Sequence, residues 1–213
     1  MSNARQQILD RIRRATGGDS TETRSDIVRN YIRHGKLDHS ACIQLMIERL
    51  QEYDAEVVEC SSEDLSACIA DRLHSSGRHT FVVPPGLPAE WLSASFDWKI
   101  DRGLTHTDVE ACDGVVTASF AGVADSGTIV LHHSPNEGRR VLTLLPDWHL
   151  CILRTSQIVE TLPEYFDRCP QPPALATYIS GPSATADIEM TRIKGVHGPR
   201  FLHVIIVHDE AGN

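Results

Sequence analysis

A carboxylate stands at a glycine-rich break in an apolar run near the middle of the chain. Asp125 lies between Gly122 and Gly127 in "AGVADSGTIVL". Glycine inside a strand marks a bulge or a close approach of the backbone, and a carboxylate there can act as a general base or a nucleophile. The alternative is a β-bulge in which Asp-Ser-Gly forms only a turn. The residues leave both interpretations open.

Two histidines are further candidates for catalysis. His149 stands at the start of an expected strand in "LLPDWHLCIL", and His197 lies in the tight turn "GVHGP" between Gly195 and Gly198. An imidazole can donate or accept a proton near neutral pH. The alternative is a histidine that is hydrogen-bonded to the backbone at the edge of a loop. His203, inside the following strand, is expected to be a core or edge histidine.

The stretch "SGPSATADIE" could bind an anion. It follows the apolar segment "ALATYIS", turns at Gly-Pro, and is predicted to begin a helix that extends to Lys194. The free N–H groups at a helix start hold phosphates or carboxylates. Gly181 lets the backbone approach a ligand, and Ser183 and Thr185 offer hydroxyls.

The alternative for this stretch is a capped helix without a ligand. Ser180 or Ser183 can cap the helix, and Asp187 can satisfy the helix dipole and repel an anion. The residues support the two interpretations equally. The candidate ligand-binding residues are therefore Gly127, Thr128, Ser180, Gly181, Ser183, Thr185 and Asp187.

The sequence lacks the motifs that hold common cofactors. Its six cysteines are scattered, without a Cys-x-x-Cys pair, as Cys42, Cys60, Cys68, Cys112, Cys151 and Cys169. The adjacent His132 and His133 would point to opposite faces of a strand, so they make a poor metal pair. There is no P-loop, dinucleotide fingerprint or nucleophile elbow. We therefore expect no metal, iron–sulfur cluster or redox cofactor on this chain.

Composition narrows the class of protein. Lysine and arginine number 20 against 29 acidic residues, a net charge of −9. An acidic surface repels phosphate backbones and anionic lipids, so nucleic-acid and membrane-surface partners are not expected. No apolar run approaches the length of a membrane span, and no signal peptide is visible. Scattered, reduced cysteines fit a cytoplasmic protein.

Alternating strands and helices are expected to position these residues. Residues 4–15 form an amphipathic helix that ends at Gly17-Gly18, so residues 1–37 are predicted to be a helical arm and linker before an α/β domain over 38–213. A helix over 38–52, the strand "AEVVEC", a helix capped by Ser62 and the strand "HTFVVPP" predict a parallel crossover.

The second half of the domain is richer in strand signals. "GVVTASFAGVADSGTIVLHH" is expected to continue through the turn "SPNEG" into a returning strand, "RRVLTLLP", while "HLCILRTSQIV" and "FLHVIIV" are further strands and "ETLPEYFDR" is a short helix. The predicted fold class is α/β, with a mainly parallel sheet flanked by helices and an antiparallel hairpin near the centre. In such sheets, ligand loops gather at the carboxyl ends of the strands.

Together these motifs resemble a known family. The ordered segments "GVADSGTIVL", "LLPDWHLCIL", "ISGPSATADIE" and "GVHGPRFLHVIIV", with "ARQQILDRIRR" at the start, resemble the lactate utilisation protein C family, which carries the LUD domain. The resemblance implies a fold like that of glucosamine-phosphate isomerase, ribose-phosphate isomerase and the CoA-transferases. It also implies a role in oxidising L-lactate to pyruvate with two iron–sulfur partner proteins, as the subunit without clusters.

Two positions depart from the family pattern. The family usually has Glu where this chain has Asp125, and often Arg where it has Ala184. The first change keeps a carboxylate with a shorter reach, and the second removes a cation that could pair with an anionic ligand. The alternative function is an independent enzyme or a sensor that binds a small organic acid or a phosphorylated metabolite. A second copy of the chain is a further candidate partner.

Overall fold

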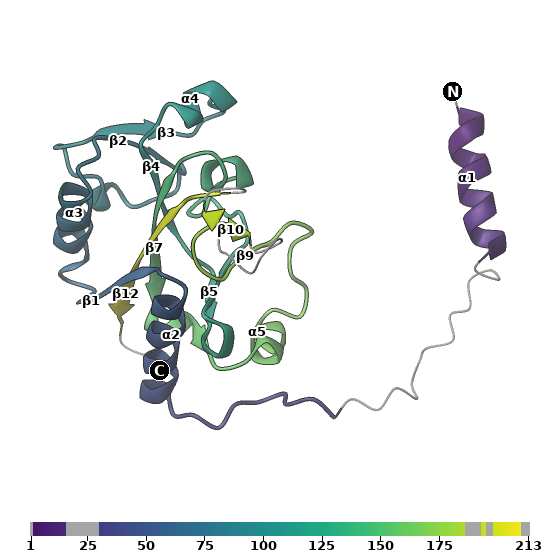
Figure 1. The fold of residues 1–213 in the computed structure, drawn as a ribbon, viewed down its shortest axis with the longest axis horizontal. Coiled ribbons are helices and arrows are strands. Elements are labelled where there is room, and N and C mark those ends of the chain that lie inside the picture. Colours follow the sequence, from purple (N-terminus) through teal and green to yellow (C-terminus); the bar gives the residue numbers. More distant parts are fainter. Residues whose placement is uncertain (1, 16–29, 186–192, 195–197, 210–213) are drawn as a thin grey trace. The chain divides into compact units, whose positions relative to one another are not determined.

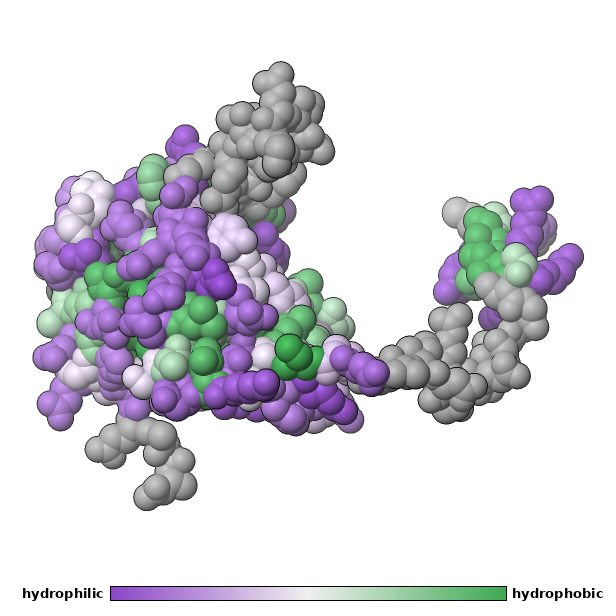
Figure 2. All heavy atoms as spheres, turned by 60° about the horizontal axis from the view of Figure 1, so that its bottom comes forward, coloured by the Kyte–Doolittle hydropathy of each residue, from purple (hydrophilic) through white to green (hydrophobic). Residues whose placement is uncertain are grey.

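The computed structural model describes residues 2–15, 30–185, 193–194 and 198–209. The chain divides into two units, Met1–Tyr31 and Ile32–Asn213. The first unit contains helix α1 (Ser2–Ala15), whose Ile8 and Ile12 side chains are exposed. Figure 2 shows apolar side chains gathered along one side of this helix. The amphipathic helix predicted for residues 4–15 is thus present.

A six-stranded parallel sheet forms the centre of the second unit (Figure 1). From one edge to the other, its strands are β1 (Glu56–Ser61), β12 (Phe201–His208), β7 (Trp148–Arg154), β4 (Gly114–Ala118), β2 (Thr80–Val83) and β3 (Asp97–Ile100). Strands β7 and β12 are apolar along almost their whole length because both faces of the sheet are covered. The expected α/β class with a parallel sheet is confirmed.

A helix lies on each face of this sheet. Helix α2 (His39–Glu52) begins at Asp38, whose carboxylate accepts a hydrogen bond from the Ala41 amide at 2.8 Å. Its apolar side packs on Val204 and Ile206 of β12. Helix α3 (Leu65–Ser75) packs on the opposite face, as Figure 1 shows, and it begins after Asp64 rather than at the expected cap, Ser62.

A smaller sheet covers the α2 side of the central sheet. Its strands, in order, are β8 (Ile158–Val159), β5 (Ala121–Val123), β6 (Thr128–Leu131) and β9 (Thr177–Ile179). Strands β5 and β6 form the antiparallel hairpin through a 3-10 turn over Ala124–Ser126. The expected returning strand in "RRVLTLLP" is wrong: residues Arg140–Thr143 form a 3-10 helix, because the hairpin already closes inside the glycine-rich break.

Two short helices complete the described domain. Helices α4 (His106–Glu110) and α5 (Leu162–Arg168) each begin with a capping box, in which a threonine and an acidic side chain exchange hydrogen bonds with the backbone. Helix α5, which was expected from the sequence, buries Tyr165 against the small sheet. Within the described ranges, none of the helices has both the length and the apolar character that crossing a bilayer requires.

The helix predicted after "SGPS" is wrong in the described residues. Ala184–Thr185 (β10) and Ile193–Lys194 (β11) form a short antiparallel pair instead. Gly181 has φ of +100°, and the Ser183 amide donates to the Pro199 carbonyl at 2.8 Å, so the chain runs beside residues 198–199 rather than coiling. β-branched residues in both strands favour this extended pairing.

Candidate functional site

A cavity of about 230 Å³ lies at the amino ends of strands β7 and β12. Its wall includes Arg140, Thr143, His149, Tyr178, Ser183 and Leu202. His149 is the second residue of β7, and Leu202 is the second residue of β12. The expectation that the ligand loops gather at the carboxyl ends of the strands is therefore wrong for this cavity. The connections that precede the strands form it.

His149 is held in the wall of the cavity by its neighbour in the sheet. The imidazole is almost completely buried, and its Nε2 lies 2.8 Å from the Thr117 hydroxyl of β4, which is also buried. Burial, with a smaller contribution from the positive charge of Arg140, lowers the pKa of His149 to about 3. The ring is therefore neutral at physiological pH and offers a hydrogen bond without a charge.

Arg140 brings a positive charge to the same cavity. The side chain is half-buried, and its Nη1 donates to the Thr143 carbonyl at 2.7 Å and to the Thr143 hydroxyl at 3.1 Å. Burial lowers the pKa of Arg140. It has no ion pair with any described residue, whereas the adjacent Arg139 pairs with Asp101 at 2.7 Å.

Sequence reasoning missed Arg140. The residue lies in a segment that was expected to be a strand, and a charged side chain in a strand is normally expected to point to solvent. The available signal was the pair Arg139-Arg140 directly before the apolar run "VLTLL". Two adjacent arginines before a core segment would each be expected to pair with an acidic group. The described structure provides one for Arg139, the Asp101 carboxylate.

The predicted residues of the hairpin and the following loop form a separate group of hydroxyls. The Thr128 hydroxyl lies 2.6 Å from that of Ser180 and 2.7 Å from that of Ser126. Gly181 continues from this group into the wall of the cavity and is packed against Tyr53 at the end of α2. The strands β6 and β9 thus bring together Thr128, Ser180 and Gly181, three of the predicted ligand-binding residues.

Asp125 lies on the turn of the hairpin and not in the cavity. Its side chain is exposed, and its amide donates to the Glu160 carbonyl at 2.9 Å. Gly127 ends the turn with φ of +58°, directly against Arg49 of α2. The structure therefore does not place Asp125 beside His149, and it supports a turn at the break.

The structure describes two of the remaining four predicted residues. Ser183 lines it, and Thr185 lies in strand β10. Asp187 and His197 lie outside the described residues.

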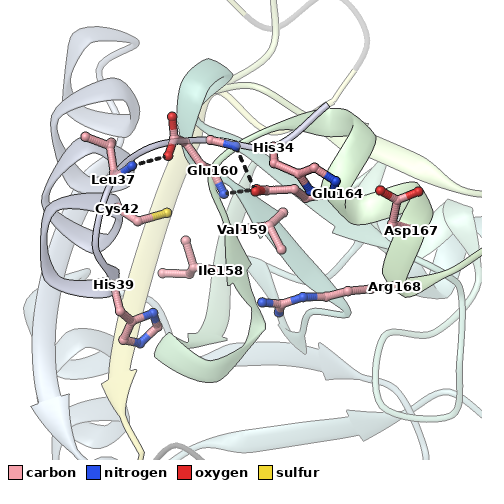
Figure 3. A pocket seen from close by; sticks show the side chains of 11 residues that line it. His34, Leu37, His39, Cys42, Ile158, Val159, Glu160, Glu164, Asp167 and Arg168 are labelled. Carbon is pink, nitrogen blue, oxygen red and sulfur yellow. Dashed lines mark hydrogen bonds between the residues drawn. The ribbon is translucent and has the colours of Figure 1, made fainter. Parts of the chain in front are cut away.

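A second cavity, of about 490 Å³, lies between the segment that precedes α2, strand β8 and helix α5 (Figure 3). The Glu160 carboxylate accepts from the Leu37 amide at 2.7 Å, and the Glu164 carboxylate accepts from the Gly35 amide at 2.9 Å. Figure 3 shows both acids pointing toward the backbone of residues 34–37. We call residues 32–37 the strap, because these bonds fasten them to the edge of the small sheet.

The residues around the second cavity do not favour a reactive thiol or a metal site. Burial, and then the charges of Glu160 and Glu164, raise the pKa of the Cys42 thiol to about 11, so it is protonated and weakly nucleophilic. All six cysteines are free. Among the residues that the structure describes, no three His, Cys, Asp or Glu side chains are grouped so that they could hold a metal ion.

Comparisons with known proteins identify the same family over nearly the whole chain. The model of the LUD domain matches residues 3–207. The chain is 35% identical to lactate utilization protein C of Deinococcus radiodurans over 213 residues, covering 97% of this chain and 96% of that protein. It is 35% identical to lactate utilization protein C of Bacillus subtilis over 176 residues, covering 72% and 73% of the two chains.

A solved structure agrees with the fold. The crystal structure of a DUF162 family protein from Deinococcus radiodurans superposes with a TM-score of 0.67 at 31% sequence identity. The match covers 81% of this chain and 99% of that one.

Proposed function

Because this chain belongs to the LUD-domain family and is a homologue of lactate utilization protein C, we propose that it is a component of an L-lactate utilisation system. In this proposal, the chain works together with iron–sulfur partner proteins in the oxidation of L-lactate to pyruvate. The observation that carries the proposal is the match to the Deinococcus radiodurans protein, which extends over nearly the full length of both chains. The proposal places the chain in the cytoplasm, where a reducing environment suits six free cysteines.

The proposed division of labour assigns electron transfer to the partners. Oxidation of an alcohol to a ketone removes two electrons, and a cofactor must carry them. The sequence contains no motif for a flavin, a nicotinamide or an iron–sulfur cluster, so this chain would bind the partners and position the acid. A second copy of the chain is a further proposed partner.

The test is lactate-dependent reduction of an artificial electron acceptor. The two iron–sulfur partners are assayed with and without this chain. We expect reduction only when the chain is present. Equal rates in its absence would contradict the proposal.

A second candidate function is that of an independent enzyme or a sensor of a small organic acid or a phosphorylated metabolite. The cavity that contains Arg140 favours it, because a half-buried cation without an acidic partner among the described residues can hold an anion without help from another protein. A thermal-shift screen of the isolated chain against such acids separates the two candidates. A hit accompanied by turnover without partners would favour the second.

Catalytic roles for Asp125, His149 and His197 remain predictions. We expect Asp125→Asn to lower lactate-dependent activity of the complex, because the substitution removes the charge and keeps the size. The side chain is exposed, so the melting temperature should change little. Unchanged activity would leave Asp125 as a turn residue.

A further inference from the structure

We propose that Arg140 and His149 form a binding site for a small monocarboxylate with an oxygen at its second carbon, a 2-hydroxy or 2-oxo acid. The choice of acid rests on the proposed function, and the location of the site rests on the cavity. Arg140 would bind the carboxylate, and His149 would hydrogen-bond the neighbouring oxygen. The site lies at the amino ends of β7 and β12, away from the exposed Asp125.

The first argument is the contrast among arginines close together in the fold. Arg139 forms two hydrogen bonds with the Asp101 carboxylate, at 2.7 and 2.9 Å, and Arg200 forms two with Asp147, at 2.6 and 2.9 Å. Arg140 has only the carbonyl and hydroxyl of Thr143 as acceptors among the described residues. No described residue accepts from its remaining N–H groups, and a carboxylate has two oxygens that match the guanidinium fork.

The second argument is the charge of the wall. Apart from Arg140, the described residues that line the cavity are neutral, and none of them carries a carboxylate. His149 is uncharged there, so the described part of the wall carries one net positive charge. One negative charge on the ligand would balance it. A doubly charged phosphate would leave one charge uncompensated, because the lining residues that the structure describes include no lysine to balance it.

The third argument is the fixed position of His149. Its Nε2 is engaged by the Thr117 hydroxyl at 2.8 Å, and Nδ1 makes no hydrogen bond to a described residue. The strand holds the ring, so Nδ1 can meet a ligand oxygen without a loss of side-chain freedom. A hydroxyl or a keto oxygen beside the carboxylate would provide this contact.

The fourth argument is size. The volume of about 230 Å³ lies below the range of about 300–1,000 Å³ that is typical of sites for drug-sized ligands. It fits an acid of a few carbon atoms rather than a nucleotide or a coenzyme.

The test is isothermal titration calorimetry of the full chain with pyruvate, L-lactate and inorganic phosphate. We expect pyruvate and L-lactate to bind and phosphate to bind more weakly. Arg140→Gln should weaken pyruvate binding by about tenfold or more, as expected when charge-assisted hydrogen bonds are lost. Arg200→Gln is the matched control, because it removes an exposed arginine that already has an acidic partner, and we expect its affinity to stay within about twofold of the wild type.

Several outcomes would overturn the site. These are no binding of either acid, tighter binding of phosphate than of pyruvate, or an equal effect of the two arginine variants. If Arg140→Gln does not fold, arginine modification of the wild-type chain by phenylglyoxal decides the question. We expect pyruvate to protect Arg140 and not Arg200, and equal labelling with and without pyruvate would reject the site.

The failure of this site can be distinguished from the failure of the proposed function. If the partners need this chain for lactate oxidation while Arg140→Gln binds and works like the wild type, the site is wrong and the function stands. If pyruvate binding depends on Arg140 while the partners oxidise lactate without the chain, the function is wrong and the site stands.

Discussion

Burial decides what the side chain of His149 can do. The imidazole Nε2 and the Thr117 hydroxyl share a hydrogen bond between two strands where water has almost no access. A proton on the ring would place a charge in this environment, close to Arg140, and this is why the pKa of His149 lies so far below its ordinary value. The residue is therefore suited to hold an oxygen by a hydrogen bond, and its protonation state is constant across the physiological range.

The lowered pKa of His149 predicts a dependence of stability on pH. Between about pH 3 and the ordinary pKa of about 6.5, the unfolded state binds a proton at His149 that the folded state does not. The free energy of unfolding should therefore fall as pH drops from about 6.5 toward 3. We expect the melting temperature of His149→Gln to depend less steeply on pH in this window than that of the wild type. The comparison uses circular dichroism, and parallel curves would contradict the assignment.

At the scale of elements, one glycine joins the hairpin to helix α2. Gly127 has φ of +58°, and a Cβ at this position would lie 2.7 Å from the Cβ of Arg49. The close approach seats the β5–β6 turn on the last turns of the helix. Gly127 therefore contributes both a left-handed conformation and a contact that a side chain would obstruct.

A matched pair of glycine variants separates these two contributions. Gly77 has a similar φ, +66°, but nothing within 4 Å of an added Cβ. We expect Gly77→Ala to destabilise the domain by about 1–2 kcal/mol, the cost of a left-handed residue with a side chain. Gly127→Ala should cost clearly more, as measured by urea unfolding. Equal losses would show that helix α2 moves away without penalty.

The strap is a second element whose position depends on a few side chains. Burial raises the pKa of Glu164, but three backbone N–H groups, those of Gly35, Thr161 and Glu160, donate to its carboxylate and together bring the pKa below its ordinary value. A lowered pKa means that this carboxylate stabilises the fold above about pH 4.5, and that the contribution is lost as pH falls through the folded pKa.

Substitution of Glu164 should loosen the strap at neutral pH. A glutamine keeps one acceptor oxygen and loses the other, so Glu164→Gln should reduce stability by about 1 kcal/mol, typical of a lost cap interaction. Hydrogen exchange of the Gly35 and Leu37 amides should become faster than in the wild type. The exposed Glu63→Gln serves as the control. Unchanged exchange at Gly35 would show that the strap is held by other contacts.

The elements differ in how well the sequence predicts them. Strands β7 and β12 could be predicted because short apolar runs are typical of parallel strands buried on both faces. Helix α5 could be predicted because Thr161 and Glu164 form a capping box around Pro163. The pair β10–β11 could not be predicted, since the Gly-Pro turn is also typical of a helix start, and the hydrogen bond from the Ser183 amide to the Pro199 carbonyl joins residues on either side of the pair. The cavity was missed for the same reason: Arg140 and Ser183 meet only in the fold.

At the scale of the whole molecule, the two units differ in how much buried apolar surface they contain. Residues 32–213 contain the four clusters of buried apolar side chains on both faces of the central sheet and around the small sheet. Helix α1 exposes Ile8 and Ile12 and has only 14 residues, which is short for an isolated helix in water. A short helix of this kind gains stability when its apolar side packs against another surface.

Removal of the first unit should leave the domain intact. We expect a chain of residues 32–213 to unfold with the same urea midpoint and slope as the full chain, within experimental error, because its buried clusters are complete. The same truncation should weaken assembly with the proposed iron–sulfur partners, measured by size-exclusion chromatography. A large drop in the urea midpoint would show that the arm belongs to the core.

The order of strands in the central sheet has a consequence for how the protein is made. The edge strand β1 pairs with β12, which is separated from it by most of the domain and is the last of the described strands to be synthesised. Until Phe201–His208 has emerged, β1 has no neighbour, and the apolar side of α2 lacks part of its packing surface. A nascent chain of this protein therefore carries uncovered hydrophobic surface until β12 has been synthesised, and such surface is what chaperones at the ribosome exit protect from aggregation.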